Sequence, residues 1–152
     1  MNGKHLPPQT LDQVYRHAEA GYPEEVCGLI LNGGGVRQSE NRQNALHQED
    51  PERFTRDART AYNLGAKDLF FLDKSLRSDA PVRIIYHSHV EVGAYFSDED
   101  ARAAAPDGEL LYPVDFLVID VTREGARGAK LFRFENGRFV EIAAFDATGQ
   151  AR

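Results

Sequence analysis

The chain has 152 residues and a mass of 17.0 kDa, the size of one ordinary domain, and area scaling predicts that folding buries roughly 70% of its surface. The formal net charge is −6 and no block of lysine or arginine occurs, which argues against a nucleic-acid partner. The single cysteine excludes an internal disulfide, and the sequence contains no signal peptide or apolar run of membrane-spanning length. We therefore expect a cytoplasmic protein without a membrane partner, and its oligomeric state stays open.

Hydrophobic periodicity and turn residues divide the chain into helices and strands. The first helix has Leu11, Val14 and Ala18 on one face, and a longer second helix is weakened by Gly65, which costs about 1 kcal/mol relative to alanine. In chain order we expect a polar tail at residues 1–8, a helix at 9–20, a strand at 26–32, a glycine turn at 33–35, an edge strand at 36–44, a loop at 45–53, a short strand beginning at Phe54, a helix at 58–77 and a strand at 82–86. There follow a helix at 98–105, strands at 114–122, 129–135 and 138–145, a type I′ turn at 136–137, and a tail at 146–152.

This order of elements, with helices between strands and a terminal hairpin, favours an α/β or α+β fold. We expect a single-domain layered structure over residues 9–145, with one mixed β-sheet flanked by helices. Residues 1–8 and 146–152 are interpreted as tails.

Four polar residues follow the apolar strand at 82–86. His87, His89, Ser97 and Asp100 form the pattern His-x-His, seven residues, Ser-x-x-Asp, for which residue frequencies predict roughly 0.0004 chance matches in the chain. Because residues i and i+2 of a strand share a face, the two imidazoles are expected to project together. Two imidazoles and one carboxylate form a three-ligand set for catalytic zinc, which keeps a fourth position open for water and favours hydrolysis.

Ser97 and Asp100 also match a capping box at the start of a helix. Taken alone, that spacing favours capping, and the histidine pair upstream is the reason to interpret Asp100 as a metal ligand as well. Ser97 can serve both roles, because a hydroxyl can accept a hydrogen bond from the backbone while donating its proton to an oxyanion.

These residues resemble the JAMM/MPN-plus zinc metallopeptidases, a family with a cytidine-deaminase-like layered fold. A second segment extends the resemblance: the family often carries Pro-x-Glu-x-Cys-Gly, and residues 23–28 read Pro-Glu-Glu-Val-Cys-Gly. The resemblance implies one zinc ion per chain, held by His87, His89 and Asp100, and a zinc-activated water with Glu25 as general base. Asn44 and Phe54 are weaker matches, and Val90 stands where the family often has proline.

The resemblance also implies a substrate. Family members act at the C-terminal Gly-Gly of ubiquitin or ubiquitin-like proteins, and short bacterial members are similar to enzymes that trim sulfur-carrier proteins. We therefore expect a metallopeptidase or isopeptidase that cleaves after the Gly-Gly of a ubiquitin-like sulfur carrier. The alternatives are a metal-free scaffold domain of the same fold and a cell-wall or phage-tail peptidase. A zinc deaminase requires a Pro-Cys-x-x-Cys pair, which a chain with one cysteine lacks.

The remaining polar residues are given structural roles. Glu24 is expected to be solvated, and Cys27 is expected to be a small core residue. His47 is interpreted as exposed in a loop, and His17 as a residue of the helix surface.

Overall fold

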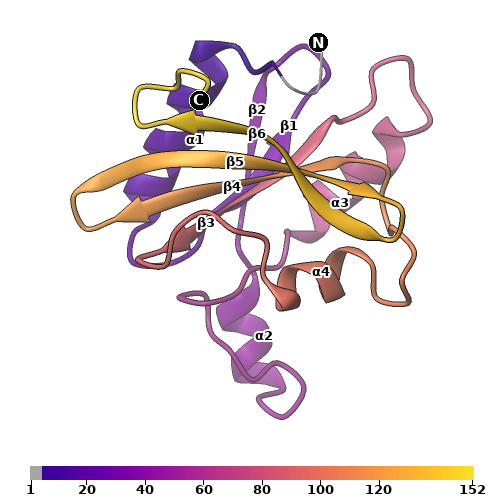
Figure 1. Ribbon diagram of the computed structural model, residues 1–152. Helices are drawn as coiled ribbons and strands as arrows, with labels where there is room; N and C mark the ends of the chain where they lie inside the picture. Colours follow the sequence, from indigo (N-terminus) through magenta and orange to yellow (C-terminus); the bar gives the residue numbers. More distant parts are fainter. Residues whose placement is uncertain (1–4) are drawn as a thin grey trace.

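The computed structural model describes residues 5–152 as a mixed α/β domain around one six-stranded sheet (Figure 1). In chain order the elements are α1 (Pro8–Gly21), β1 (Cys27–Ile30), β2 (Val36–Ser39), α2 (Gln43–Glu49), α3 (Ala66–Ser75), β3 (Ile84–Val90), α4 (Asp98–Ala104), β4 (Asp115–Thr122), β5 (Gly125–Glu135) and β6 (Arg138–Asp146). The strand order is β2-β1-β3-β4-β5-β6, in which β3 and β4 are parallel and the other neighbouring pairs are antiparallel. The predicted layered fold with a mixed sheet is confirmed.

The sheet has an apolar core on each face. Helix α1 covers one face of the sheet, and α3 and α4 lie on the other (Figure 1). On the first face Leu11 of α1 packs in a cluster with Tyr86 of β3, and on the second Leu72 of α3 and Ala104 of α4 cluster with Ile85 of β3. Because neighbouring residues of a strand point to opposite faces, β3 is buried on both sides, as is usual where helices cover a sheet. Each fully buried aliphatic side chain contributes about 1.5–3 kcal/mol to folding.

Gly28 is required by the close approach of two strands. A Cβ atom at this position would lie 2.5 Å from the carbonyl oxygen of Arg37 and 2.5 Å from the hydroxyl oxygen of Tyr86. We expect Gly28→Ala to lower the free energy of unfolding by about 1–3 kcal/mol, because the backbone of β2 must move to relieve the overlap. Urea denaturation measures the effect, with Gly33→Ala as the control, since a Cβ atom there meets nothing within 4 Å. Equal losses in both variants would contradict this explanation.

The helix predicted over residues 58–77 is wrong in its first part, because α3 begins only after Gly65. The preceding backbone bonds to distant segments instead: the carbonyl of Ala58 accepts a hydrogen bond from the N–H of Glu25 at 2.7 Å, and Leu64 forms an isolated bridge with Asn41. Pairing with segments far away in the sequence therefore overrides the helical pattern.

Other boundaries also differ from the prediction. Part of the predicted loop over residues 45–53 is helical, since it belongs to α2, and Phe54 lies in irregular backbone rather than in a strand. The strand expected over residues 36–44 ends at Ser39, although it lies at the sheet edge as predicted. The predicted I′ turn is confirmed by φ angles of 51° at Asn136 and 82° at Gly137.

Two histidines are less exposed than predicted. His17 is half-buried on α1, with its Nδ1 atom 2.7 Å from the hydroxyl oxygen of Tyr86. His47 lies on α2, with its Nδ1 atom 2.7 Å from the carbonyl oxygen of Phe54. The prediction for Cys27 is confirmed: the side chain is fully buried, and burial raises the pKa of its thiol to about 12.

Both predicted tails contact the domain where the structure describes them. Leu6 is buried in the core beside α1, and Ala151 forms an isolated bridge with Phe145. Residues 1–4 of the predicted N-terminal tail lie outside the described residues. Within residues 5–152, no helix combines the length and the apolar character needed to cross a membrane.

Candidate metal centre

The two histidines of the motif lie within β3, which continues past the predicted end of the strand to Val90. His87 and His89 project from the same face, and Ser88 points to the other, where its hydroxyl accepts a hydrogen bond from the N–H of Val26 at 2.8 Å. The His87 side chain is fully buried, and among the described residues neither of its ring nitrogens has a hydrogen-bond partner. Most buried polar atoms in proteins have a hydrogen-bond partner, so these two buried nitrogen atoms need an explanation.

Asp100 is brought to the histidines by the first turn of α4. The predicted capping box is present: the N–H of Asp100 donates to the Ser97 hydroxyl at 3.0 Å, and the N–H of Ser97 donates to Asp100 Oδ2 at 3.0 Å. The same oxygen lies 3.1 Å from Nε2 of His89 and 3.3 Å from Nε2 of His87. Burial alone would raise the pKa of Asp100, but His87 and His89 outweigh it and hold that pKa well below its usual range.

The three side chains fit a metal ion. Their ligand atoms all lie within 4.8 Å of one another. Ligands about 2.0–2.2 Å from a tetrahedral zinc ion are separated by about 3.4 Å, close to the two distances between Asp100 and the histidines. Nδ1 of His89 lies 3.2 Å from the carbonyl oxygen of Gly93, which leaves Nε2 for a metal. His87, whose ring nitrogens make no hydrogen bond within the described residues, completes the donor set.

Two tyrosine rings contact the imidazole rings of His87 and His89, and the sequence analysis identified neither tyrosine. Tyr62 stacks on His87 with ring centroids 4.3 Å apart, and Tyr95 meets the ring of His89 edge-on at 4.8 Å. Packing of this kind restricts the orientation of a ligand ring, as hydrogen bonds do. Tyr62 comes from the segment predicted to be helical, so no local signal placed it beside a histidine.

Glu25 reaches the centre from the residues just before β1. The antiparallel register pairs Cys27 with His87, and continuing it by two residues sets Glu25 opposite His89. The side chain is buried, at 7% exposure. Burial first, and then the charge of Asp100, raise the pKa of Glu25 to about 9, while the positive charge of Arg56 opposes this shift.

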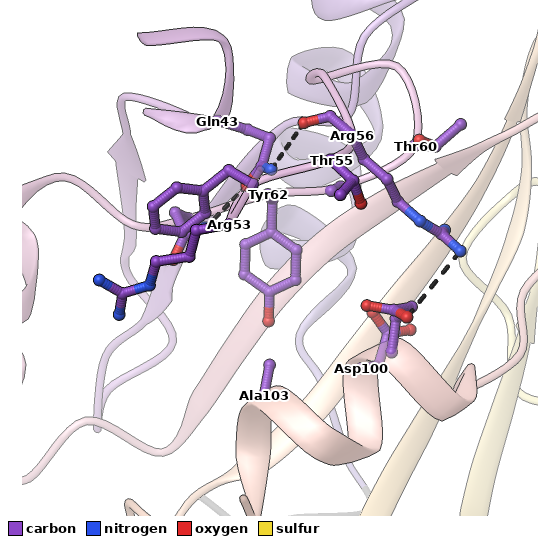
Figure 2. Close-up of a pocket in the computed structure, with 12 residues that line it drawn as sticks. Gln43, Arg53, Thr55, Arg56, Thr60, Tyr62, Asp100 and Ala103 are labelled. Atoms are coloured by element: carbon purple, nitrogen blue, oxygen red, sulfur yellow. Dashed lines mark hydrogen bonds and ion pairs between the residues drawn. The ribbon is translucent and has the colours of Figure 1, made fainter. Parts of the chain in front are cut away.

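Glu25, His89, Ser97 and Asp100 line one cavity of about 230 Å³, so the structure brings these predicted residues together. A second cavity of about 180 Å³ adjoins it and shares Asp100 and Arg56. Figure 2 shows Tyr62 and Arg56 projecting into this second cavity towards α4, which carries Asp100.

The two weaker matches have different positions. Phe54 lines the second cavity. Asn44 instead connects two loops: its Nδ2 donates to the exposed carboxylate of Glu24 at 2.8 Å, and its Oδ1 accepts from the N–H of Ala58 at 2.8 Å. This arrangement gives Asn44 a structural role, and it leaves Glu24 outside both cavities, in line with the expectation that it is solvated.

Ser97→Ala is expected to lower the free energy of unfolding by about 1 kcal/mol, because it removes the hydroxyl that caps α4. Ser97→Thr keeps a hydroxyl and is expected to retain most of that stability. Chemical denaturation of the two variants beside wild type measures the difference. If the alanine variant is as stable as the threonine variant, the cap does not contribute.

Comparisons with known proteins bear on the fold and the family of this chain. A solution structure of a protein from Desulfitobacterium hafniense has a TM-score of 0.63 at 19% identity, with 90% of this chain and 88% of that chain covered. A protein from Salinibacter ruber has a TM-score of 0.57 at 21% identity, with 90% and 87% covered. These likenesses show the fold alone, and the comparison with curated proteins gave no match. Residues 7–134 match the family described as prokaryotic homologs of the JAB domain, and because that match spans most of the chain, this protein belongs to the JAB/MPN family.

Proposed function

We propose that this protein is a zinc-dependent metallopeptidase that hydrolyses the peptide bond after the C-terminal Gly-Gly of a ubiquitin-like sulfur-carrier protein. The observation that carries the proposal is the cavity shared by Glu25, Ser97, His89 and Asp100. A buried acid–base group and a hydroxyl donor beside a three-ligand metal group are the parts that metal-assisted hydrolysis of an amide requires.

Zinc held by His87, His89 and Asp100 would supply Lewis acidity and lower the pKa of a water molecule towards about 7. In this proposal Glu25, which lines the same cavity, takes a proton from the attacking water and passes it to the leaving nitrogen. The positive charge of Arg56 favours the ionised form of Glu25 and opposes the effect of burial, which raises the pKa of that carboxyl group. The Ser97 hydroxyl already accepts a hydrogen bond from Asp100, so its own proton is free to stabilise the oxyanion of the substrate.

The proposed substrate class is supported by the size of the site. A Gly-Gly tail has no side chains, so it fits a narrow approach to a buried metal group, and the cavity of about 230 Å³ is smaller than the sites of drug-sized ligands, about 300–1,000 Å³. The chain resembles the short bacterial members of the family, and residues 5–152 contain no inserted domain of the kind used for polyubiquitin. Both points favour a sulfur carrier.

The test is intact-mass spectrometry of a ubiquitin-like sulfur carrier that bears extra residues after Gly-Gly, incubated with the zinc-loaded protein. We expect wild type to remove the extension after the second glycine. Glu25→Gln is the control and is expected to leave the mass unchanged. An unchanged mass with wild type would remove this substrate class, and would direct attention to a cell-wall peptide or to a scaffold role without catalysis.

A further inference from the structure

Arg56 lies beside Asp100, and its guanidinium makes one long ion pair, with Glu99. Its side chain is about half exposed, at 48%, and lines both cavities beside Asp100. The carboxylate of Glu99 lies 3.9 Å from it, too far for a hydrogen bond, and that carboxylate already accepts one from Arg102. Within residues 5–152, no hydrogen bond engages the Arg56 guanidinium, which can therefore bind a ligand.

The backbone that carries Arg56 is nevertheless held firmly. The amide of Gln43, a side chain only 4% exposed, donates to the carbonyl of Arg56 at 2.8 Å. Two residues later, Ala58 donates to Asn44 at 2.8 Å and accepts from the N–H of Glu25 at 2.7 Å. Because hydrogen bonds fix this irregular segment at both places, binding at Arg56 requires little further ordering of the backbone.

The position of Glu25 decides which part of the substrate faces Arg56. In hydrolysis, the oxygen of water bonds to the glycine carbonyl carbon, the C–N bond breaks, and Glu25 delivers a proton to the leaving nitrogen. That nitrogen must lie within hydrogen-bond reach of Glu25, and Glu25 lines only the cavity of about 230 Å³, together with Arg56. Arg56 therefore lines the cavity in which the leaving group must lie.

We propose that Arg56 binds the free α-carboxylate of the residue that is released, so that the site selects a substrate with one residue, or a very short extension, after Gly-Gly. This inference rests on the proposed function and names the substrate class more closely. A guanidinium binds a carboxylate through two parallel hydrogen bonds, which makes arginine well suited to recognising a chain terminus. The volume of the cavity suits so small a leaving group.

A purely structural role for Arg56 would be to balance the negative charges of Glu25 and Asp100. The two roles differ in one measurable way. Loss of charge balance alters the hydrolysis of every substrate alike, whereas loss of a carboxylate-binding group alters only substrates that end in a carboxylate.

The test compares two carriers that end in Gly-Gly-Ala, one with a free carboxylate and one with a C-terminal amide, by measuring kcat/KM for each. We expect wild type to prefer the acid by about ten- to a hundredfold, the usual effect of a charged hydrogen-bonded pair. Arg56→Gln is expected to abolish the preference, and Arg56→Lys to retain part of it. Arg59→Gln is the matched control, because Arg59 lines the same cavity but its guanidinium is bonded to Asp57 at 2.8 Å, so the preference is expected to persist.

Equal cleavage of acid and amide by wild type would overturn the role of Arg56 and leave the proposed function intact. A preference that persists in Arg56→Gln would overturn it as well. Cleavage of neither carrier by wild type would overturn the proposed function together with this inference.

Discussion

Glu25→Gln is expected to slow Gly-Gly-directed cleavage by about 10²- to 10⁴-fold while leaving the zinc content of the protein unchanged. Glutamine has the shape of glutamic acid but cannot accept and return the proton of the attacking water. The fold is expected to tolerate the change. In the metal-free protein, burial raises the pKa of Glu25 to about 9, so the group is neutral at pH 7. The substitution therefore replaces a neutral acid with a neutral amide. Turnover is measured by intact mass, and zinc by elemental analysis.

Glu24→Gln is the matched control for this variant. Glu24 is the neighbouring residue, is exposed, and accepts a hydrogen bond from Asn44 outside both cavities. We expect it to keep the wild-type rate. A wild-type rate in Glu25→Gln would remove Glu25 from the mechanism, and a loss of zinc in that variant would mean that Glu25 contributes to metal binding.

His89→Ala and Asp100→Asn are expected to lose zinc binding and, with it, the stabilisation that zinc gives. At a free zinc concentration 100-fold above the dissociation constant, the metal adds about 2.7 kcal/mol to the stability of wild type. Asparagine at position 100 can still accept the hydrogen bond from Ser97, so the cap of α4 survives while the ligand charge is lost. Thermal unfolding with and without zinc measures the effect.

His5→Ala is the control for nonspecific zinc binding, because His5 is exposed and lines a different cavity. The melting temperature of the His5→Ala variant is expected to rise on addition of zinc as much as that of wild type. If His89→Ala and Asp100→Asn respond to zinc in the same way, the ligand assignment is wrong.

The strand that carries the histidines shows why part of the site could be predicted from sequence. Ile84 and Ile85 are apolar and β-branched, so strand conformation follows from local preference. Once the strand is given, period-two geometry places His87 and His89 on one face. The capping box at Ser97 is local as well, because its bonds join residues three positions apart.

Residues 58–65 show the limit of such reasoning. Their apolar spacing predicts a helix, but the carbonyl of Ala58 bonds to Glu25 and Leu64 pairs with Asn41, which are contacts that no local pattern contains. The same error hid Tyr62, whose ring lies on His87 only because this segment is not helical.

The sequence by itself determined the elements whose stabilising contacts are local: the amphipathic α1, the strand β3, the cap of α4 and the spacing of His87, His89 and Asp100. Only the tertiary structure decided that Glu25 lies opposite His89 and that Arg56 lines the same cavity as both. The reason is physical. Local periodicity indicates which face of an element is buried. Hydrogen bonds between residues far apart in the chain set the register between β1 and β3 and the path of the irregular segment, and no local pattern contains them.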